Sequence, residues 1–294
     1  MILLTGATGN TGSQVVHALR RSGRDVRAFV RDPQKARRLL GGDVELAVGD
    51  FADGGSVRAA LEGVEEVVLS CADDPRRVEW ENDLIDAAAA AGVRRVVKLS
   101  TIGAEPGAPV AFWDWHGRIE EHLRSSALNA VVLRSSFYMT NLLAAAEQVR
   151  QGSLVAPAGS ARVAMIDPVD VGAVAAAVLT DGGQDGETLV LTGPEAVTWA
   201  QVAGILTAVT GRSVEFVDVP PEAARRGMIE SGLPEFVADQ LLAIFAMLRE
   251  GAAETVTGTV EELTGRPSRT FENFARDHAA AFAPVGAGAA TPSV

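Results

Sequence analysis

The first twelve residues restrict the fold of this chain more than any other segment. They read Met-Ile-Leu-Leu-Thr-Gly-Ala-Thr-Gly-Asn-Thr-Gly, so an apolar run is followed by glycines at 6, 9 and 12, and a helical pattern begins directly after them. A strand, a glycine turn and a helix in this order suit the pyrophosphate of a dinucleotide. The spacing differs from the common Gly-x-Gly-x-x-Gly fingerprint, and an ordinary strand-to-helix turn without a ligand is the alternative. The residues predicted to hold the pyrophosphate region are Gly6, Thr8, Gly9, Asn10, Thr11 and Gly12.

Each glycine has a separate physical reason in this prediction. Gly6 permits a sharp turn off the strand, and Gly9 lets backbone amides approach the phosphates without a Cβ in the way. Gly12 lets the helix pack close to the strand, with its N-terminal dipole facing the anion.

Apolar strands alternate with helical patterns through the first half of the chain. The expected strands are 2–4, 25–30, 44–48, 66–69, 95–99 and 130–133, and the expected helices lie near 11–22, 33–40, 54–62, 76–91, 114–126 and 138–150. Strands separated by helices of this length form right-handed βαβ units and a parallel sheet. We therefore predict an α/β fold with a doubly wound parallel Rossmann sheet, and a ligand at the carboxyl ends of its strands.

The second half has a different pattern. It predicts strands at 188–191 and 214–217 and helices at 199–210, 222–231 and 234–249, which together indicate a small, mainly helical C-terminal substrate lobe. The predicted domains are a Rossmann domain at 1–155 with a contribution from about 185–192, and a substrate-cleft lobe at 156–283. Residues 284–294 have too little apolar bulk to pack and are predicted to be a flexible tail.

Composition and charge argue against several classes of protein. The net charge of −12 disfavours a nucleic-acid partner, and no membrane span is expected because no run of 18 uninterrupted apolar residues occurs. The single cysteine, Cys71, fits a reducing cytoplasm, and the composition suggests a bacterial source. We expect a cytoplasmic monomer or homodimer. Residues 1–40 nevertheless carry eight Arg and Lys against two Asp, which favours a phosphate-rich small ligand over a merely solvated helix face.

The end of the second predicted strand, Phe29-Val30-Arg31-Asp32, bears on the choice of dinucleotide. An acid there binds the ribose 2′-OH of NAD, whereas an arginine pairs with the 2′-phosphate of NADP. Asp32-Pro33 is also a good helix start, with Asp32 as N-cap. This leaves Arg31, assisted by Lys35, for the phosphate and predicts NADP(H) as the cofactor.

Residues after the third and fourth predicted strands are expected to contact the rest of the cofactor. Phe51 is placed against the adenine and Asp50 is expected to accept from its amino group, with a turn residue and a core aromatic as the alternative. Ser70 is expected beside the ribose. Cys71 next to it is interpreted as a small buried residue and not as a nucleophile.

Several motifs along the chain belong together. They are Thr5-Gly-Ala-Thr-Gly-Asn-Thr-Gly12, Val30-Arg-Asp-Pro33, Gly49-Asp50, Val132-Leu-Arg-Ser-Ser-Phe137 followed by Asn141, Ile166-Asp167 with Asp170-Val171, and Thr264-Gly-Arg-Pro-Ser-Arg-Thr-Phe271. This set resembles the NmrA-like family, atypical short-chain dehydrogenases/reductases that include the regulator NmrA, redox-sensor proteins and quinone or azo-dye reductases. Ser135 stands where that family usually has a proline. The resemblance covers about residues 1–282 and implies a Rossmann domain, NADP(H) and a small lobe bounding a substrate cleft.

The catalytic residues of orthodox short-chain dehydrogenases are missing. Those enzymes use a Tyr-x-x-x-Lys pair and a serine, and the phenol donates a proton as hydride arrives. Here Phe112 and His116 stand at that spacing, and the only tyrosine is Tyr138. Because NADPH supplies the hydride, the protein must orient it and manage one proton.

Three residues are candidates for that work. His116 is expected to supply the proton or hold ribose hydroxyls, with Glu120 fixing its tautomer; a surface His–Glu pair is the alternative. Ser100 is expected to orient the substrate carbonyl, unless it serves as a cap or turn residue. Tyr138 is the second candidate donor, or else an aromatic lining the pocket. Four histidines are too scattered for a metal site, and none is predicted.

Aromatic and apolar residues suggest the kind of substrate. Trp113, Trp115, Phe137 and Met139 are expected around one cleft mouth, which suits a flat aromatic or quinone-like compound, although a plain hydrophobic core is the alternative. The sequence therefore predicts an NADPH-dependent reductase of a small aromatic, quinone or polyketide-like carbonyl compound. The rival prediction, favoured by the missing Tyr–Lys pair, is a non-catalytic NADP(H)-binding redox sensor acting through protein partners.

Overall fold

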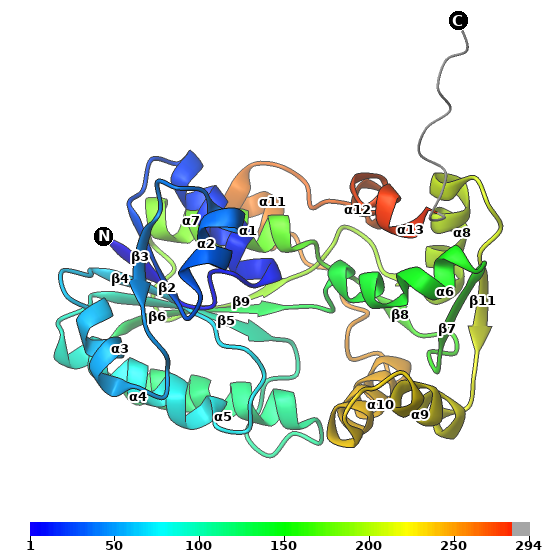
Figure 1. Cartoon of the computed structure of the whole chain (residues 1–294), viewed down its shortest axis with the longest axis horizontal. Helices are drawn as coiled ribbons and strands as arrows, with labels where there is room; N and C mark the ends of the chain where they lie inside the picture. Colours follow the sequence, from blue (N-terminus) through cyan, green and yellow to red (C-terminus); the bar gives the residue numbers. More distant parts are fainter. Residues whose placement is uncertain (284–294) are drawn as a thin grey trace, which may run out of the picture. The chain divides into compact units, whose positions relative to one another are not determined.

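The computed structural model describes residues 1–283, and the predicted tail at 284–294 lies outside the described residues. The chain divides into two compact units, which we describe separately (Figure 1). Unit 1 consists of Met1–Ser136, Pro168–Thr192 and Thr257–Ser268. Unit 2 consists of Phe137–Asp167, Gly193–Val256 and, among the described residues, 269–283.

These units differ from the predicted domain boundaries. The first unit ends at Ser136 and not near 155. It includes residues 168–184 and 257–268, which were predicted for the substrate lobe, as well as residues 185–192, which were predicted for the Rossmann domain. The reason is packing: α7 (Pro168–Asp181) lies against α1 (Asn10–Arg21). A Cβ on Gly172 would come within 2.7 Å of the Gln14 carbonyl carbon, so glycine permits this close approach.

Unit 1 is built on a parallel sheet, with seven strands among residues 1–283 in the order β3-β2-β1-β4-β5-β6-β9 (Figure 1). The strands are β1 (Ile2–Leu4), β2 (Val26–Val30), β3 (Glu45–Val48), β4 (Glu66–Leu69), β5 (Arg95–Thr101), β6 (Asn129–Ser135) and β9 (Thr188–Leu191). In register, Ile2 pairs with Val26 on one side and Glu66 on the other. The strand order therefore reverses at β1 and β4, which confirms the predicted doubly wound Rossmann fold.

Helices cover both faces of this sheet. One face carries α1, α2 (Pro33–Leu40), α7 and α11 (Thr259–Thr264), and the other carries α3 (Gly54–Ala60), α4 (Arg77–Ala90) and α5 (Ala111–Ser125) (Figure 1). The whole of β1 and β4 is buried, as expected for apolar strands covered on both faces.

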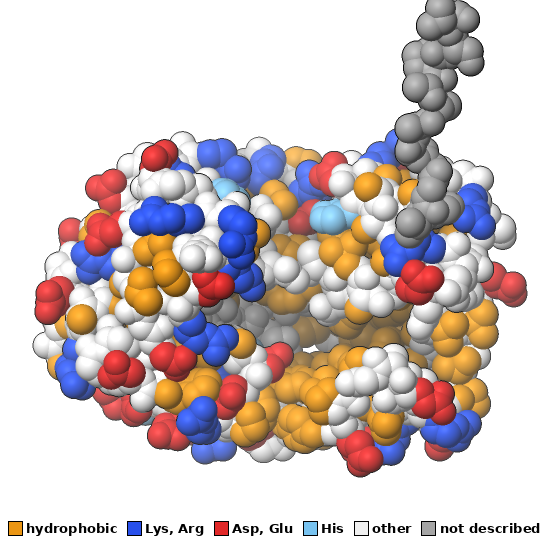
Figure 2. Space-filling view, viewed as in Figure 1, with side chains coloured by type: hydrophobic (Ala, Val, Ile, Leu, Met, Phe, Trp, Pro, Cys, Tyr) orange, Lys and Arg blue, Asp and Glu red, His pale blue; other side chains and the backbone are white. Residues whose placement is uncertain are grey.

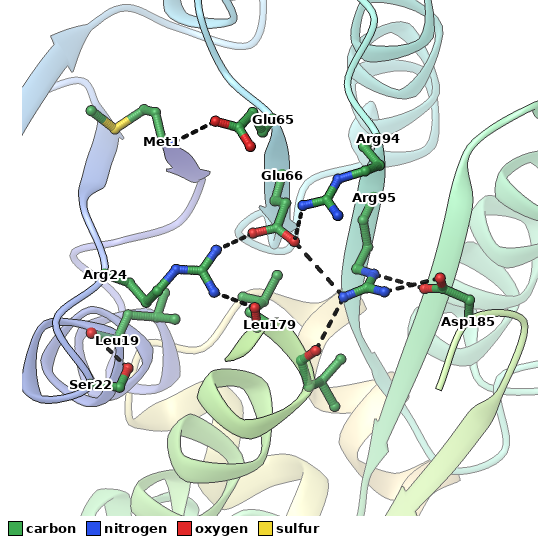
Figure 3. Close-up of polar contacts among 11 residues, drawn as sticks. Met1, Leu19, Ser22, Arg24, Glu65, Glu66, Arg94, Arg95, Leu179 and Asp185 are labelled. Atoms are coloured by element: carbon green, nitrogen blue, oxygen red, sulfur yellow. Dashed lines mark hydrogen bonds and ion pairs between the residues drawn. The ribbon is translucent and has the colours of Figure 1, made fainter. Parts of the chain in front are cut away.

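Buried Glu66 ties together the amino ends of the strands (Figure 3). Its carboxylate is 2% exposed and pairs with Arg24, with Arg94 at 3.2 Å and with Arg95 at 3.8 Å. Arg24 and Arg95 also donate to backbone carbonyls of α7, and Arg95 pairs with Asp185 at 2.7 Å. This charged cluster holds the sheet edge opposite to the one where a ligand is expected.

Unit 2 is mainly helical. Its helices are the 3-10 helix η1 (Met139–Ala145), α6 (Ala146–Arg150), α8 (Trp199–Thr210), α9 (Pro221–Glu230), α10 (Glu235–Arg249), α12 (Phe271–Asp277) and α13 (Ala279–Phe282). Two small sheets, partly unpredicted, accompany them: β7 (Ser153–Ala156) with β11 (Glu215–Asp218), and β8 (Arg162–Val163) with β10 (Val197–Thr198). No helix within residues 1–283 is long and apolar enough to cross a membrane.

Two ion pairs give the late sequence motifs a structural role. Within unit 1, Arg266 lies 3.9 Å from the buried carboxylate of Asp170. Within unit 2, Arg269 binds Asp167 at 2.7 Å. The two arginines of the Gly-Arg-Pro-Ser-Arg segment therefore bind the two aspartates of the Asp-x-x-Asp segment. One of these ion pairs lies in each unit.

Candidate functional site

The glycine turn lies at the carboxyl end of β1. Gly6 has φ +65°, a left-handed conformation that favours glycine, and its carbonyl accepts from the Gly9 amide at 2.9 Å. A Cβ on Gly12 would lie 2.2 Å from the Gly6 oxygen. The first turn of α1 is therefore packed directly on the glycine turn, and residue 12 has no room for a side chain.

The N-terminus of α1 fits an anion. Gly9 is its N-cap, provides no side-chain cap, and is followed by no acidic residue in the first turn. The first amides of a helix have no intrahelical acceptor, and the helix dipole favours negative charge at this end. Thr8, Asn10 and Thr11 line the same exposed or half-exposed turn. These features match a pyrophosphate site.

Thr5 brings Ser70 beside this turn. Its Oγ1 donates to the Ser70 carbonyl at 2.7 Å and accepts from the Ser70 amide at 2.9 Å, which joins the ends of β1 and β4. The Ser70 Oγ would lie 3.2 Å from a Cβ on Gly6. The predicted cofactor residues Gly6 and Ser70 are therefore neighbours.

Asp32 caps α2 as expected, and this leaves the neighbouring Arg31 side chain exposed. Asp32 Oδ1 accepts from the amides of Gln34 and Lys35, both at 2.9 Å, which confirms the N-cap of α2. The bond from the Lys35 amide contributes most to lowering the pKa of this carboxyl below its ordinary value. Arg31 is exposed and has no ion-pair partner within residues 1–283. Figure 2 shows further Lys and Arg side chains gathered over α1 and α2.

Asp50 and Phe51 both take part in local packing. Asp50 Oδ1 accepts from the Ala52 amide at 2.9 Å, as in an Asx turn. The Phe51 ring meets Phe29 edge to face at 5.7 Å and lies nearly parallel to Trp80 at 6.3 Å. The structure thus supplies the turn residue and core aromatic of the alternative interpretation, at the edge where the adenine is expected.

A buried ionic chain, which sequence reasoning missed, lies between β5 and α4. Lys98 Nζ is fully buried, 2.8 Å from Glu81 Oε2, and donates to the Leu99 carbonyl at 2.6 Å. Arg77 Nε donates to Glu81 Oε1 at 2.8 Å, and Arg77 also pairs with Asp73 at 2.7 Å. Burial lowers the pKa of Lys98 to about 8. A lysine flanked by Val96, Val97 and Leu99 was the available signal, because a buried charge needs a partner.

The buried Glu120 carboxylate binds Ser100. This contact corrects the expected pairing of Glu120 with His116 and the alternative that Ser100 is a cap or turn residue. Ser100 Oγ donates to Glu120 Oε1 at 2.6 Å, while Arg134 and Arg124 bind Oε2 at 2.7 and 2.5 Å. Ser100 and Arg134 are register partners on β5 and β6, so both reach the same carboxylate. Glu120 therefore binds these three residues and does not fix the tautomer of His116. Ser100 is a buried strand residue whose proton is already donated, and it serves as neither cap nor turn residue.

His116 is buried on the inner face of α5. It is 8% exposed, which excludes a surface His–Glu pair, and its Nδ1 has no hydrogen-bond partner in the described part of the chain. Burial, then the charges of Arg77, Lys98 and Arg134, lower its pKa well below the ordinary value. The ring is therefore neutral near pH 7, so it can make a hydrogen bond but is no reservoir of an acidic proton.

The aromatic residues predicted around one mouth divide between the units. In unit 1, Trp113 is buried against Gly103, and Trp115 packs on Phe112 and the core. In unit 2, Phe137 meets the buried Trp199 at 5.9 Å, and Met139 is buried. The hydrophobic-core alternative therefore applies to Trp113 and Met139.

Further polar residues lie near the carboxyl ends of β4 and β6. Tyr138 belongs to unit 2, at the N-cap of η1, where it forms a bridge with Ile166. At the carboxyl end of β6, the Oγ atoms of buried Ser135 and Ser136 find no hydrogen-bond partner among residues 1–283. Cys71 is half-buried, and burial raises the pKa of its thiol to about 11, so it stays protonated. Within the described residues, no three potential metal ligands converge.

Comparisons with known proteins agree over nearly the whole chain. Residues 1–275 match the model of the NmrA-like family. The NAD(P)H azoreductase of Xenophilus azovorans is 38% identical over 96% of this chain and 99% of that protein. The (4-alkanoyl-5-oxo-2,5-dihydrofuran-3-yl)methyl phosphate reductase of Streptomyces griseus subsp. griseus is also 38% identical, over 97% of this chain and 100% of that protein. The crystal structure of an Escherichia coli NADPH-dependent quinone oxidoreductase complexed with NADPH has a TM-score of 0.87 at 29% identity, covering 95% of this chain and 99% of that one.

Proposed function

The chain belongs to the NmrA-like family, and we propose that it is an NADPH-dependent reductase of small aromatic, quinone or polyketide-like compounds. The names of its relatives, an azoreductase, a furanone phosphate reductase and a quinone oxidoreductase, support this class of reaction. The observation that carries the proposal is the uncapped N-terminus of α1, packed on a glycine turn where residue 12 has no room for a Cβ.

The cofactor is assigned to residues along the carboxyl edge of unit 1. The glycine turn with Thr8, Asn10 and Thr11 holds the pyrophosphate, and Arg31 with Lys35 holds the 2′-phosphate. Ser70 is placed at the ribose next to the turn. The unpartnered polar atoms of His116, Ser135 and Ser136 are assigned to the nicotinamide end, since buried polar groups are normally hydrogen-bonded. When bound, NADPH supplies the hydride.

The proposed reduction also requires a proton donor. Ser100 already donates to Glu120, and His116 is neutral, so neither is suited to protonate a product. Ser100 and Glu120 instead fix the ends of β5 and β6, and His116 holds a ribose hydroxyl through a hydrogen bond. Tyr138 remains the candidate donor, with solvent water as the other source.

This lack of a ready acid in unit 1 also favours a second function, a non-catalytic NADP(H) sensor. Both functions require NADP(H) binding, so turnover distinguishes them. NADPH oxidation should be followed by absorbance against a panel of quinones, azo dyes and aromatic ketones. Turnover with any of them supports the reductase, and tight NADPH binding without turnover supports the sensor.

A further inference from the structure

Arg76, Trp80 and Phe51 form a chain of stacked contacts, which we name the Arg76 stack. The rings of Phe51 and Trp80 are 17° from parallel with centroids 6.3 Å apart. The guanidinium carbon of Arg76 lies 4.4 Å from the Trp80 ring centroid. Because Phe51 also packs on Phe29, the contacts run from the core of unit 1 to a charged surface group.

The stack lies at the edge of the sheet that carries the cofactor residues. Phe51 follows the carboxyl end of β3, and Arg76 ends the loop that leaves the carboxyl end of β4. In the sheet, β3 is the neighbour of β2, whose end carries Arg31. The stack is therefore on the adenosine side of the pyrophosphate site.

Arg76 is held mainly by the indole. Its side chain is 60% exposed, and its one ion pair within residues 1–283, with Asp74, is 3.7 Å long. The next residue, Arg77, is by contrast buried and bound by two carboxylates at 2.7 and 2.8 Å. Arg77 therefore takes part in a buried ionic cluster, whereas Arg76 presents a planar cation to solvent.

We propose that Arg76, held flat by Trp80, is the wall against which the adenine of the cofactor stacks. A guanidinium is planar and weakly hydrated, and it stacks readily on aromatic faces. Phe51 then supports Trp80 from the core and does not meet the base itself. This inference rests on the proposed NADP(H) cofactor. Since the adenine is common to NADP and NAD, Arg76 contributes equally to both, unlike Arg31.

The test is calorimetric measurement of the Kd for NADP⁺ and for NAD⁺. Arg76→Ala should raise both values by about fivefold, the factor that corresponds to about 1 kcal/mol, and leave their ratio unchanged. Arg76→Lys should behave in the same way, because a point charge keeps the cation but loses the planar stack. Trp80→Ala should weaken both nucleotides as well, and Trp80→Phe should retain most of the affinity.

Arg118→Ala is the matched control, because Arg118 is 55% exposed and lies 3.8 Å from Asp114. It should leave both Kd values unchanged. Circular dichroism melting confirms that each variant is folded, and Arg76→Ala removes only an exposed side chain. Binding by Arg76→Ala that equals the control, full rescue by Arg76→Lys, or a loss confined to NADP⁺ would each overturn the inference. A wild-type protein that binds neither nucleotide would instead refute the proposed function.

Discussion

Replacing Arg31 by alanine should change the cofactor preference of this protein. Arg31 follows β2, is exposed and pairs with no carboxylate in the described chain. The Oδ1 atom of its neighbour Asp32 accepts hydrogen bonds from two backbone amides, both at 2.9 Å. A hydrogen bond to a charged group contributes about 1.5–3 kcal/mol, and exposure places Arg31 at the lower end of that range. The expected loss is therefore about ten- to thirtyfold in NADP⁺ affinity, with less than about a twofold change for NAD⁺.

The assay is titration calorimetry with each nucleotide at low and at high salt. The NADP⁺ loss should shrink at high salt because the contact is exposed and screened. Arg21→Ala is a suitable control, since Arg21 is an exposed arginine at the far end of α1. If Arg31→Ala weakened NADP⁺ and NAD⁺ equally, or if Arg21→Ala had the same effect, the assignment of Arg31 to the 2′-phosphate would be wrong.

Three further predictions test the structure around the site. Gly12→Ala should abolish NADPH binding in calorimetry, because its Cβ would lie 2.2 Å from the Gly6 oxygen, whereas Gly204→Ala on α8 has open space and should be tolerated. Glu81→Gln should lower the free energy of unfolding by about 3–5 kcal/mol in urea titrations, because it leaves Lys98 and Arg77 buried without their shared carboxylate. The double variant Glu81→Leu/Lys98→Met should recover much of that loss, and no recovery would contradict the argument. The pKa of Lys98 is about 8 in the folded chain against 10.5 as its ordinary value, so above pH 8 the unfolded chain holds a proton that the folded chain has released. The free energy of unfolding should accordingly rise by about 1 kcal/mol between pH 8 and 9, and this rise should be absent in Lys98→Met.

That rise should level off above pH 9 because of Cys71. Its thiol pKa is raised from 9.0 to about 11, so in this range the unfolded chain loses a proton that the folded chain keeps. The two groups then act on stability in opposite directions.

The elements of unit 1 could be predicted because their signals are local. Apolar runs, glycines at turns and an Asp-Pro helix start are each read within a few residues, and β1, β4 and α2 have the predicted bounds. The N-cap role of Asp32 followed from the same local chemistry. In unit 2 the strand at 214–217 was predicted and corresponds to β11, whereas β7, β8 and β10 were missed, because two-residue strands such as β8 and β10 carry no periodicity of their own.

The interior of the candidate site could not be predicted from spacing along one helix. His116 and Glu120 are one turn apart, and the sequence favoured a contact between them. In the fold, Arg134 on β6 and Ser100 on β5 reach Glu120 from the sheet and use its oxygens. Lys98 and Glu81 likewise meet across two elements. Such partners depend on strand register and on which helix covers which strand, and both are tertiary properties.

The boundaries of the two units also depend on tertiary packing and could not be predicted from the sequence. Helix α7 lies far along the chain from α1, and only their packing, permitted by Gly172, places residues 168–184 in unit 1. A prediction that follows chain order places this helix in the second lobe. The composition of this helix gives no indication that it packs in unit 1.

The most direct test of the central claim is a single-turnover experiment with enzyme-bound NADPH. The protein is loaded with NADPH, mixed rapidly with a naphthoquinone or an azo dye, and followed by the near-ultraviolet absorbance of the reduced nicotinamide. We predict that this absorbance decays at a rate that increases with acceptor concentration, and that NADPH deuterated at the transferring C4 position decays more slowly, because the C–H bond breaks in the hydride transfer. Bound NADPH that stays reduced in the presence of every acceptor would contradict the assignment as a reductase and leave the protein a binder of NADP(H).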